Sequence, residues 1–452
     1  MEKNLTTGSV FKNVILFSLP YLLSYFLQTL YGLADLFIIG QFDTVASTTA
    51  VSIGSQVMHM LTVMIVGLAM GTTVSIGQAV GGGDRKRAAQ DVGNTVTLFM
   101  VLSILLMGVL LVLVDPIVSV MSTPEEAVSG TSDYLTICFI GIPFITAYNI
   151  ISSIFRGMGD SKSPMYFIAV ACAANIALDY IFMGPLGMGP SGAALGTTLS
   201  QAISVAVSLV VILKRRSLPL QKKDFRPLRP VMGKILSIGV PIAMQDGLIQ
   251  IAFIIITIIA NRRGLNDAAA VGIVEKIISF LFLVPSSMLS TVSALGAQNI
   301  GAKKPERALQ TLRYAIAIAA GFGLLISIVI QFTAEPIVSL FTDQNAADGA
   351  AVIHLGGQYL RGYIWDSLFA GIHFSFSGYF CACGKSGLSF LHNILAIALV
   401  RVPGAYLTSQ LFPSTLFPMG LATAAGSLLS VVICVIAFMI IRRRGEEMHL
   451  GN

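Results

Sequence analysis

The sequence predicts an all-α polytopic membrane protein whose twelve transmembrane helices form two pseudo-symmetric six-helix lobes. The first of three supporting observations is composition: of 452 residues, 55% are hydrophobic and 11% are charged, with a mean hydropathy of +0.82. A soluble domain carries about 25% charged residues, so this chain has too little charge to cover a water-facing surface. Disorder is excluded as well, because disordered chains combine low hydrophobicity with high charge. We therefore expect the lipid bilayer to solvate most of the apolar surface.

The second observation is the spacing of apolar segments, scanned in windows of about 20 residues. Six predicted spans precede a basic central stretch: 12–39, 47–79, 89–114, 130–155, 164–183 and 191–213. Six more follow it: 232–260, 268–298, 308–334, 349–381, 387–410 and 417–441. Several are longer than the hydrocarbon core requires, so we expect them to tilt or to project beyond it.

Basic residues set the predicted orientation. Of the 28 lysines and arginines, 23 fall on the side of the N-terminus, and only Arg262 and Arg263 fall on the opposite side. Because loops rich in Lys and Arg stay in the cytoplasm, we expect both termini to be cytoplasmic in a multi-pass protein of the cell (inner or plasma) membrane. The net charge of +6 belongs to these loops and does not indicate nucleic-acid binding.

The third observation is an internal repeat. Residues 78–81 (Gln-Ala-Val-Gly) match residues 298–301 (Gln-Asn-Ile-Gly), and Asp115 and Glu335 each precede Pro-Ile-Val-Ser, both at an offset of 220. Basic triplets at 214–216 and 442–444 close the two halves. An even number of spans per half means that both halves enter the membrane from the same side, so they are parallel repeats.

The repeat predicts an N-terminal lobe (1–213), a cytoplasmic linker (214–230) and a C-terminal lobe (231–452). In transporters, such lobes hold a site near the membrane midplane that opens alternately to each side. Pro20 and Pro241 stand in the first span of each lobe. Each proline removes a backbone hydrogen bond, which allows its helix to bend or switch.

Three motifs resemble enzyme or metal signatures without the context that such sites need. Residues 187–192 match Gly-x-Gly-x-x-Gly without a preceding strand, and residues 383–386 end like a phosphate loop without its first glycine. Cys381 and Cys383 have no second pair of ligands nearby. We therefore expect turns at both glycine-containing segments, no enzyme activity, no metal centre and no cofactor. Any uphill transport must then use an ion gradient.

Acids at bilayer depth are the main functional candidates, because a charge there costs at least ~2.5–3.5 kcal/mol. The N-terminal half places Asp35 in its first span and Asp179 in its fifth, with Asn175 one helical turn before Asp179 and Thr197 in the sixth. No basic residue is predicted at this depth. Either one carboxyl group holds a proton, or a small cation such as Na⁺ binds the oxygens. The alternative is that both acids cap broken helices or face water.

The C-terminal half carries polar residues of both signs within its spans. These candidates for substrate contact are Gln245, Asp246, Glu275, Lys276, Arg361, Asp366 and Arg401. Three acids and three bases can neutralise one another. Structural pairing and substrate contact are therefore both open for this group.

Together these residues resemble the multidrug and toxic compound extrusion (MATE) family of transporters, in its prokaryotic type. The resemblance covers nearly the whole chain and rests on Pro20 fifteen residues before Asp35, Gly40-Gln-Phe, Gly77-Gln78, Gln298-Asn-Ile-Gly301, Arg156-Gly-Met-Gly-Asp160, and Asn175…Asp179 with Gly192-Ala-Ala-Leu-Gly-Thr197. It implies that the cation site of the N-terminal lobe maps onto Asp35, Asn175, Asp179 and Thr197. Asp246 lies earlier in its helix than the acid that one branch carries there, which favours the branch that relies on the N-terminal lobe.

The resemblance further implies export of amphipathic, often cationic, drugs or toxic compounds in exchange for H⁺ or Na⁺, by alternating access. We expect a monomer in the lipid bilayer that confers drug resistance. The alternative is a lipid-linked precursor flippase of the same superfamily. A flippase for anionic pyrophosphate headgroups would need a cavity lined with Arg and Lys, whereas this chain offers only Lys276, Arg361 and Arg401 within its spans.

Overall fold

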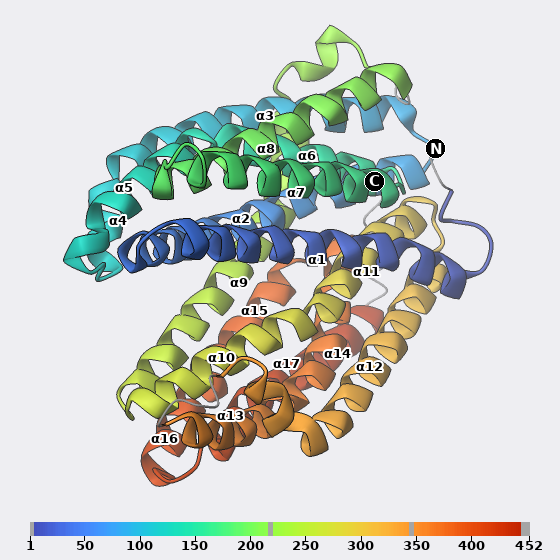
Figure 1. Ribbon diagram of the computed structural model, residues 1–452. Coiled ribbons are helices and arrows are strands. Elements are labelled where there is room, and N and C mark those ends of the chain that lie inside the picture. The colour runs from blue at the N-terminus through green and yellow to red at the C-terminus, as the bar shows by residue number, and fades with distance from the viewer. Residues whose placement is uncertain (1–3, 216–219, 343–347, 444–452) are drawn as a thin grey trace. The chain divides into compact units, whose positions relative to one another are not determined.

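A computed structural model describes residues 4–215, 220–342 and 348–443 of the chain. Every regular element within these ranges is a helix (Figure 1), as the sequence predicts. Arg216 and Arg444, the last residues of the two basic triplets, lie outside the described residues.

The chain divides into two compact units, which we describe separately. The first unit contains Leu19–Ala243, and the second contains Leu5–Ser18 together with the chain from Met244. Both divisions fall inside long helices, α1 (Val10–Phe42) and α9 (Arg229–Asn261), and each of these helices contains one of the two prolines. The lobe and linker boundaries that the repeat predicts stay a prediction.

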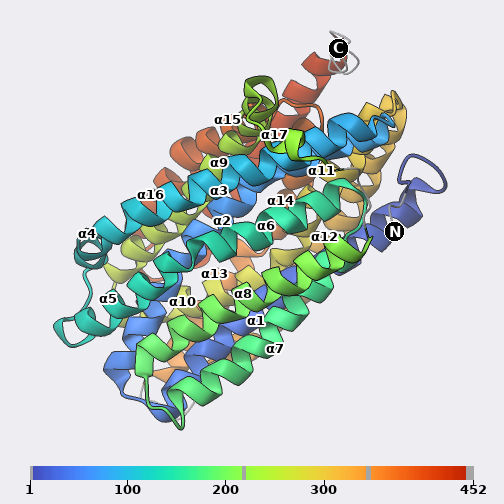
Figure 2. The same cartoon turned by 90° about the horizontal axis from the view of Figure 1, so that it is seen from above.

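The first unit consists of most of α1, the start of α9 and the elements between them. These are α2 (Val45–Gly81), α3 (Arg85–Val112), α4 (Val114–Val120), α5 (Glu125–Ile140), α6 (Ile142–Gly157), α7 (Lys162–Met183), α8 (Gly189–Arg215) and the 3₁₀ helix η1 (Lys222–Phe225). Side-chain oxygens of Thr44 and Asp84 cap α2 and α3 by accepting from backbone N–H groups of Ser47 and Arg87. Helices α7 and α8 run side by side (Figures 1 and 2).

The second unit contains the rest of α9 and nine further elements. These are α10 (Leu265–Leu281), α11 (Leu283–Gly301), α12 (Pro305–Ser339), α13 (Gly349–Tyr363), α14 (Trp365–Ala382), α15 (Gly387–Ala396), the π-helical turn η2 (Ile397–Arg401), α16 (Val402–Leu411) and α17 (Phe417–Arg443). The π turn ends at Arg401, two residues before Pro403, which has no N–H to donate to the preceding turn of a regular α-helix.

Ten helices in the described ranges are long and apolar enough to cross a membrane, or eleven if the pair α5 and α6, bent by 49°, forms one span. Each of the twelve predicted spans coincides with a helix or with consecutive helices. The segment 349–381 is not among the ten or eleven. It consists of α13 and α14, and it carries Arg361, Asp366 and two histidines, which lower its hydropathy.

Each unit has an apolar core, and apolar side chains also cover its outside. Tyr134 and Phe139 lie in the core of the first unit, and Tyr359 and Tyr363 lie in that of the second. Large side chains on the outside include Phe332, which is 80% exposed. Exposed residues of this kind fit a protein that is solvated by lipid.

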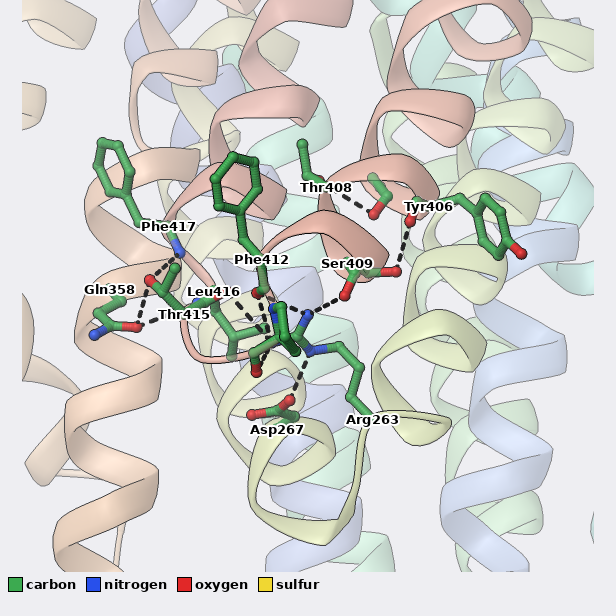
Figure 3. A network of polar contacts seen from close by, with 12 residues as sticks. Arg263, Asp267, Gln358, Tyr406, Thr408, Ser409, Phe412, Thr415, Leu416 and Phe417 are labelled. Carbon is green, nitrogen blue, oxygen red and sulfur yellow. Dashed lines mark hydrogen bonds and ion pairs between the residues drawn. The ribbon is translucent and has the colours of Figure 1, made fainter.

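Arg263 connects the end of α9 to the loop between α16 and α17 within the second unit. Its guanidinium donates to the carbonyl oxygens of Ser409 at 2.6 Å and Pro413 at 2.9 Å, and it pairs with Asp267 at 2.6 Å (Figure 3). The charge of this arginine is therefore neutralised locally. Its presence on the side that the sequence predicts to be poor in basic residues has a structural cause.

Candidate cation site and the other charges within the spans

Three helices of the first unit bring together the four residues that the sequence singles out. Helix α1 carries Asp35, α7 carries Asn175 and Asp179 one turn apart, and α8 carries Thr197. Asp35 is 2% exposed, and both α7 residues are fully buried. The Thr197 hydroxyl donates to Oδ2 of Asp35 at 3.1 Å. The two carboxyl groups lie within hydrogen-bonding reach of each other, and the Asn175 amide lies beside both.

These acids lack the donors that two ionised carboxylates need. Oδ1 of Asp35, both carboxyl oxygens of Asp179 and both amide atoms of Asn175 are buried without a hydrogen-bond donor or acceptor of suitable geometry. Within the described ranges, no lysine or arginine forms an ion pair with either acid. Burying an unpaired charge is costly, so the pair needs a proton between its carboxyl groups or a cation among its oxygens. Four side chains that supply carboxylate, amide and hydroxyl oxygens suit a hard cation.

Gly196, Tyr31 and Cys138 lie beside this site. A Cβ atom added to Gly196 would overlap Oδ1 of Asp179 and lie 3.0 Å from its Cγ, so only glycine leaves room for the carboxylate there. Tyr31, one turn before Asp35 on α1, lies near the Asp35 carboxyl, as does Cys138 of α5. Neither Tyr31 nor Gly196 was singled out as a site residue from the sequence. The spacing of Tyr31 and Asp35, four residues on one helix, was the available signal.

The second unit holds a buried acid that, unlike Asp35 and Asp179, has a basic partner. Arg401, in the π turn, donates to Oδ2 of Asp366 and to the hydroxyl of Tyr363, both at 2.9 Å. Arg401 is 7% exposed and Asp366 is fully buried. The pairing of acids and bases that the sequence left open is therefore present for these two residues.

The other candidates of the second unit do not join this pair. Arg361 pairs with Glu335 of α12 at 3.3 Å, an acid that the sequence analysis did not consider as its partner. Glu275 accepts from the Thr257 hydroxyl at 3.2 Å, and Lys276 is exposed. Gln245 is fully buried, and its amide donates to Asp246 at 3.5 Å. Mutual neutralisation of all six charges is thus not what the structure shows.

The two prolines lie close to the points where their helices pass from one unit to the other. Pro20 follows Leu19, the first α1 residue of the first unit, and Pro241 stands three residues before Met244. Ser24 donates its hydroxyl to the Pro20 carbonyl at 2.8 Å, a contact between a serine and the residue four before it that often bends helices.

The two glycine-containing motifs form turns, as predicted. Gly187 has a φ of +58° in the turn between α7 and α8, and Gly189, the first residue of α8, has a φ of +56°. Gly384 has a φ of +68° in the turn between α14 and α15. Such φ values favour glycine. All five cysteines are buried and free of disulfides, and the described residues hold no group of three or more His, Cys, Asp or Glu suited to a metal ion.

Comparison with known proteins extends these observations to the whole chain. The MatE family model matches residues 20–181 and 241–407. The probable multidrug resistance protein YoeA of Bacillus subtilis (strain 168) is 29% identical over 411 residues, covering 89% of this chain and 88% of that protein. The multidrug export protein MepA of Staphylococcus haemolyticus (strain JCSC1435) is 26% identical over 414 residues, covering 90% and 89%.

The fold is equally well matched. A crystal structure of MATE in complex with MaL6 superposes with a TM-score of 0.89 at 23% identity, covering 98% of this chain and 97% of that one. The family match spans most of both repeats, and the fold match includes nearly every residue. The chain therefore belongs to the MATE family of multi-pass membrane transporters, and it is a transport protein rather than an enzyme.

Proposed function

We propose that this protein is a cation-coupled antiporter that exports amphipathic, often cationic, compounds from the cell by alternating access. The observation that carries the proposal is the pair Asp35 and Asp179, two buried acids without a basic partner. A site of this kind can change its charge by one when a cation arrives or leaves. The relatives named for multidrug resistance and export support the substrate class.

The coupling ion exchanges at the four-residue site of the first unit. A proton would bridge the carboxyl groups of Asp35 and Asp179, with Thr197 donating to Asp35. A sodium ion would instead take oxygens from both acids, Asn175 and Thr197. Both ions suit the same residues, so transport under separate gradients decides between them.

Helices α1 and α9 transmit the exchange to the lobes. Each of them divides between the two compact units near its proline, and a proline inside a helix removes one backbone hydrogen bond. When the charge at Asp35 changes, α1 bends near Pro20 while α9 bends near Pro241. The substrate site then closes to one side of the membrane and opens to the other, with both termini in the cytoplasm.

The energy available sets a condition on stoichiometry. One charge that crosses 100 mV yields ~2.3 kcal/mol, enough for a roughly forty-fold concentration ratio. Exchange of one coupling ion for one monovalent cationic drug moves no net charge, so the membrane potential then contributes nothing. Two coupling ions would restore that contribution, and two carboxyl groups could accept them.

The alternative is a flippase for lipid-linked anionic precursors, and two of the three basic residues that it would use are already paired with acids. Arg361 is paired with Glu335, and Arg401 is paired with Asp366. An anionic headgroup would have to compete with these acids. We therefore favour the antiporter.

Reconstituted liposomes test both possibilities. Purified protein is given a pH gradient in one preparation and a sodium gradient in another, and the movement of a fluorescent cationic dye is followed. A third preparation contains a fluorescent lipid-linked sugar. We expect dye movement against its gradient with one of the two ions. Dye that only equilibrates under both gradients, or lipid-linked sugar that crosses while dye does not, would refute the antiporter.

A further inference from the structure

The segment that leads from the 3₁₀ helix η1 into α9 is held against the side of α3 in the first unit. We call residues 220–229 the linker strap. Asn94 of α3 holds the strap from two sides, because its Nδ2 donates to the Asp224 carbonyl oxygen at 3.1 Å and its Oδ1 accepts from the backbone N–H of Leu228 at 2.7 Å. A Cβ atom added to Gly93 would overlap the same carbonyl oxygen. The strap therefore has a fixed place on α3.

The linker strap lies where the exposed apolar surface of its neighbouring helices ends. The Thr97 hydroxyl of α3 donates to the Phe225 carbonyl oxygen of the strap at 2.8 Å. Val101, one turn farther along α3 and about 6 Å away along its axis, is the first large apolar residue that this helix exposes, at 55%. On α8 the last such residue is Leu213, which is 73% exposed and directly precedes the exposed Lys214. Because lipid tails cover exposed apolar surface, the strap lies at the depth of the lipid headgroups.

The exposed side chains of the linker strap are basic and apolar. Its cations are all exposed, and they are Lys222, Lys223, Arg226 and Arg229. None of them forms an ion pair with an acid of the described ranges. The only acid of the strap, Asp224, is buried, and its Oδ2 accepts from the backbone N–H of Gln221 at 2.8 Å. Leu220, Phe225 and Leu228 are each 38% exposed. The strap thus presents four cations and three apolar side chains without a negative charge among them.

We propose that the linker strap binds the headgroups of anionic phospholipids at the membrane face that the sequence predicts to be cytoplasmic. Each basic residue close to an anionic membrane surface favours binding about fivefold. Apolar side chains beside such cations strengthen it by entering the boundary between headgroups and acyl chains. An acidic soluble protein could contact the cations, but exposed apolar side chains at headgroup depth favour lipid. The inference does not depend on the transported substrate or on the coupling ion.

Fluorescence quenching of the full-length protein in lipid nanodiscs tests the proposal. All five native cysteines are buried, so a bimane label reacts selectively with the cysteine of a Pro227→Cys variant, at an exposed position of the strap. The nanodiscs contain phosphatidylcholine and, at equal mole fraction, either phosphatidylglycerol or phosphatidylcholine that carries a doxyl quencher next to its headgroup. We expect phosphatidylglycerol to quench the label more strongly, and the water-soluble quencher acrylamide to quench it weakly.

Two double variants of the labelled protein separate the linker strap from general surface charge. Lys222→Gln with Lys223→Gln should lower the preference for phosphatidylglycerol at least about fivefold. Lys162→Gln with Lys303→Gln removes the same charge from two exposed lysines outside the strap, and it should leave the preference unchanged. Equal quenching by both lipids without these substitutions, or an equal change in the two double variants, would overturn the proposal. Strong quenching by acrylamide with neither lipid effective would also overturn it, because the strap would then face water and be open to a soluble partner.

Discussion

Replacing Asp35 by asparagine tests whether the acid pair couples transport to an ion gradient. The amide has nearly the shape of a protonated carboxyl group. In the wild type the Thr197 hydroxyl donates to Oδ2 of Asp35 at 3.1 Å, and the amide oxygen of the variant can accept the same hydrogen bond. The substitution removes a buried charge that has no basic partner, so the variant should unfold at or above the wild-type temperature. It also removes the group that gains and loses the coupling ion. The variant should therefore fold normally but should no longer couple transport to the ion gradient.

The expected magnitude follows from the gradient. A difference of one pH unit supplies about 1.4 kcal/mol for each proton, which supports a tenfold concentration ratio of substrate. In liposomes with the membrane potential set to zero, a wild type that exchanges one proton per dye molecule should reach that tenfold ratio, and exchange of two protons should give a hundredfold ratio. With Asp35→Asn the ratio should fall to one. If the coupling ion is sodium, a tenfold sodium gradient gives the same numbers.

Asp91 of α3 provides the matched control. It is another buried acid of the first unit, but its Oδ2 accepts from the Ser75 hydroxyl at 2.8 Å. Asp91→Asn should therefore keep a dye ratio above one under the same gradient. The reasoning fails if Asp35→Asn sustains the wild-type ratio. It also fails if Asp35→Asn unfolds many degrees earlier than the wild type, because the acid would then be structural.

Three other substitutions have outcomes set by local contacts. Gly196→Ala places a methyl group on the Asp179 carboxylate, so dye efflux should fall at least tenfold at a stability cost of about 1–3 kcal/mol, measured by efflux and by thermal unfolding. Arg263→Ala removes a buried ion pair and several bonds to carbonyl oxygens, and thermal unfolding in detergent should report a loss of about 3–5 kcal/mol. Arg401→Met should cost a similar amount by leaving Asp366 buried without its cation, and adding Asp366→Asn should recover more than half of it.

The first two substitutions each have a control variant, and the third is checked by its double variant. Gly32→Ala, on α1 with open space around the new methyl group, should leave efflux unchanged. Arg262→Ala removes the exposed arginine beside Arg263 and should change stability by less than about 0.5 kcal/mol. An Arg401→Met and Asp366→Asn double variant no more stable than Arg401→Met alone would show that the pair does not act as a unit.

The sequence predicted the helices well but not their breaks or the contacts between distant segments. Hydropathy averages about 20 residues, so it cannot detect the bend of 49° between α5 and α6, where one residue, Gly141, separates two helices. Residues 5–18, which the repeat places at the start of the predicted N-terminal lobe, make their contacts with the second unit, and the lobe boundaries themselves stay a prediction. Within that unit Lys304 donates to the Thr6 carbonyl at 3.0 Å and Arg307 to the Gly8 carbonyl at 3.1 Å. Contacts between residues almost 300 positions apart leave no local pattern.

The candidate cation site was more predictable than the charges of the second unit, for a physical reason. An acid without a nearby base is conspicuous in an apolar span, and four residues identified in this way lie together. Charges of both signs allow many pairings, and the sequence alone does not rank them. Arg361 pairs with Glu335 because α12 and α13 pack together. The hydropathy of the predicted spans does not indicate which helices pack against each other.

The two halves repeat their backbone but not their electrostatics, which argues for coupling in one unit. A guanidinium stays charged at any physiological pH, so Asp366 has a permanent cationic partner in Arg401 at 2.9 Å. That pair has no low-cost way to take up and release a cation. Asp35 and Asp179 have no such partner among the described residues, and their pair therefore needs an ion from outside to become neutral. An ion gradient can do work only at a site that must exchange the ion, and this is the reason for which we place the proposed coupling at Asp35 and Asp179 of the first unit.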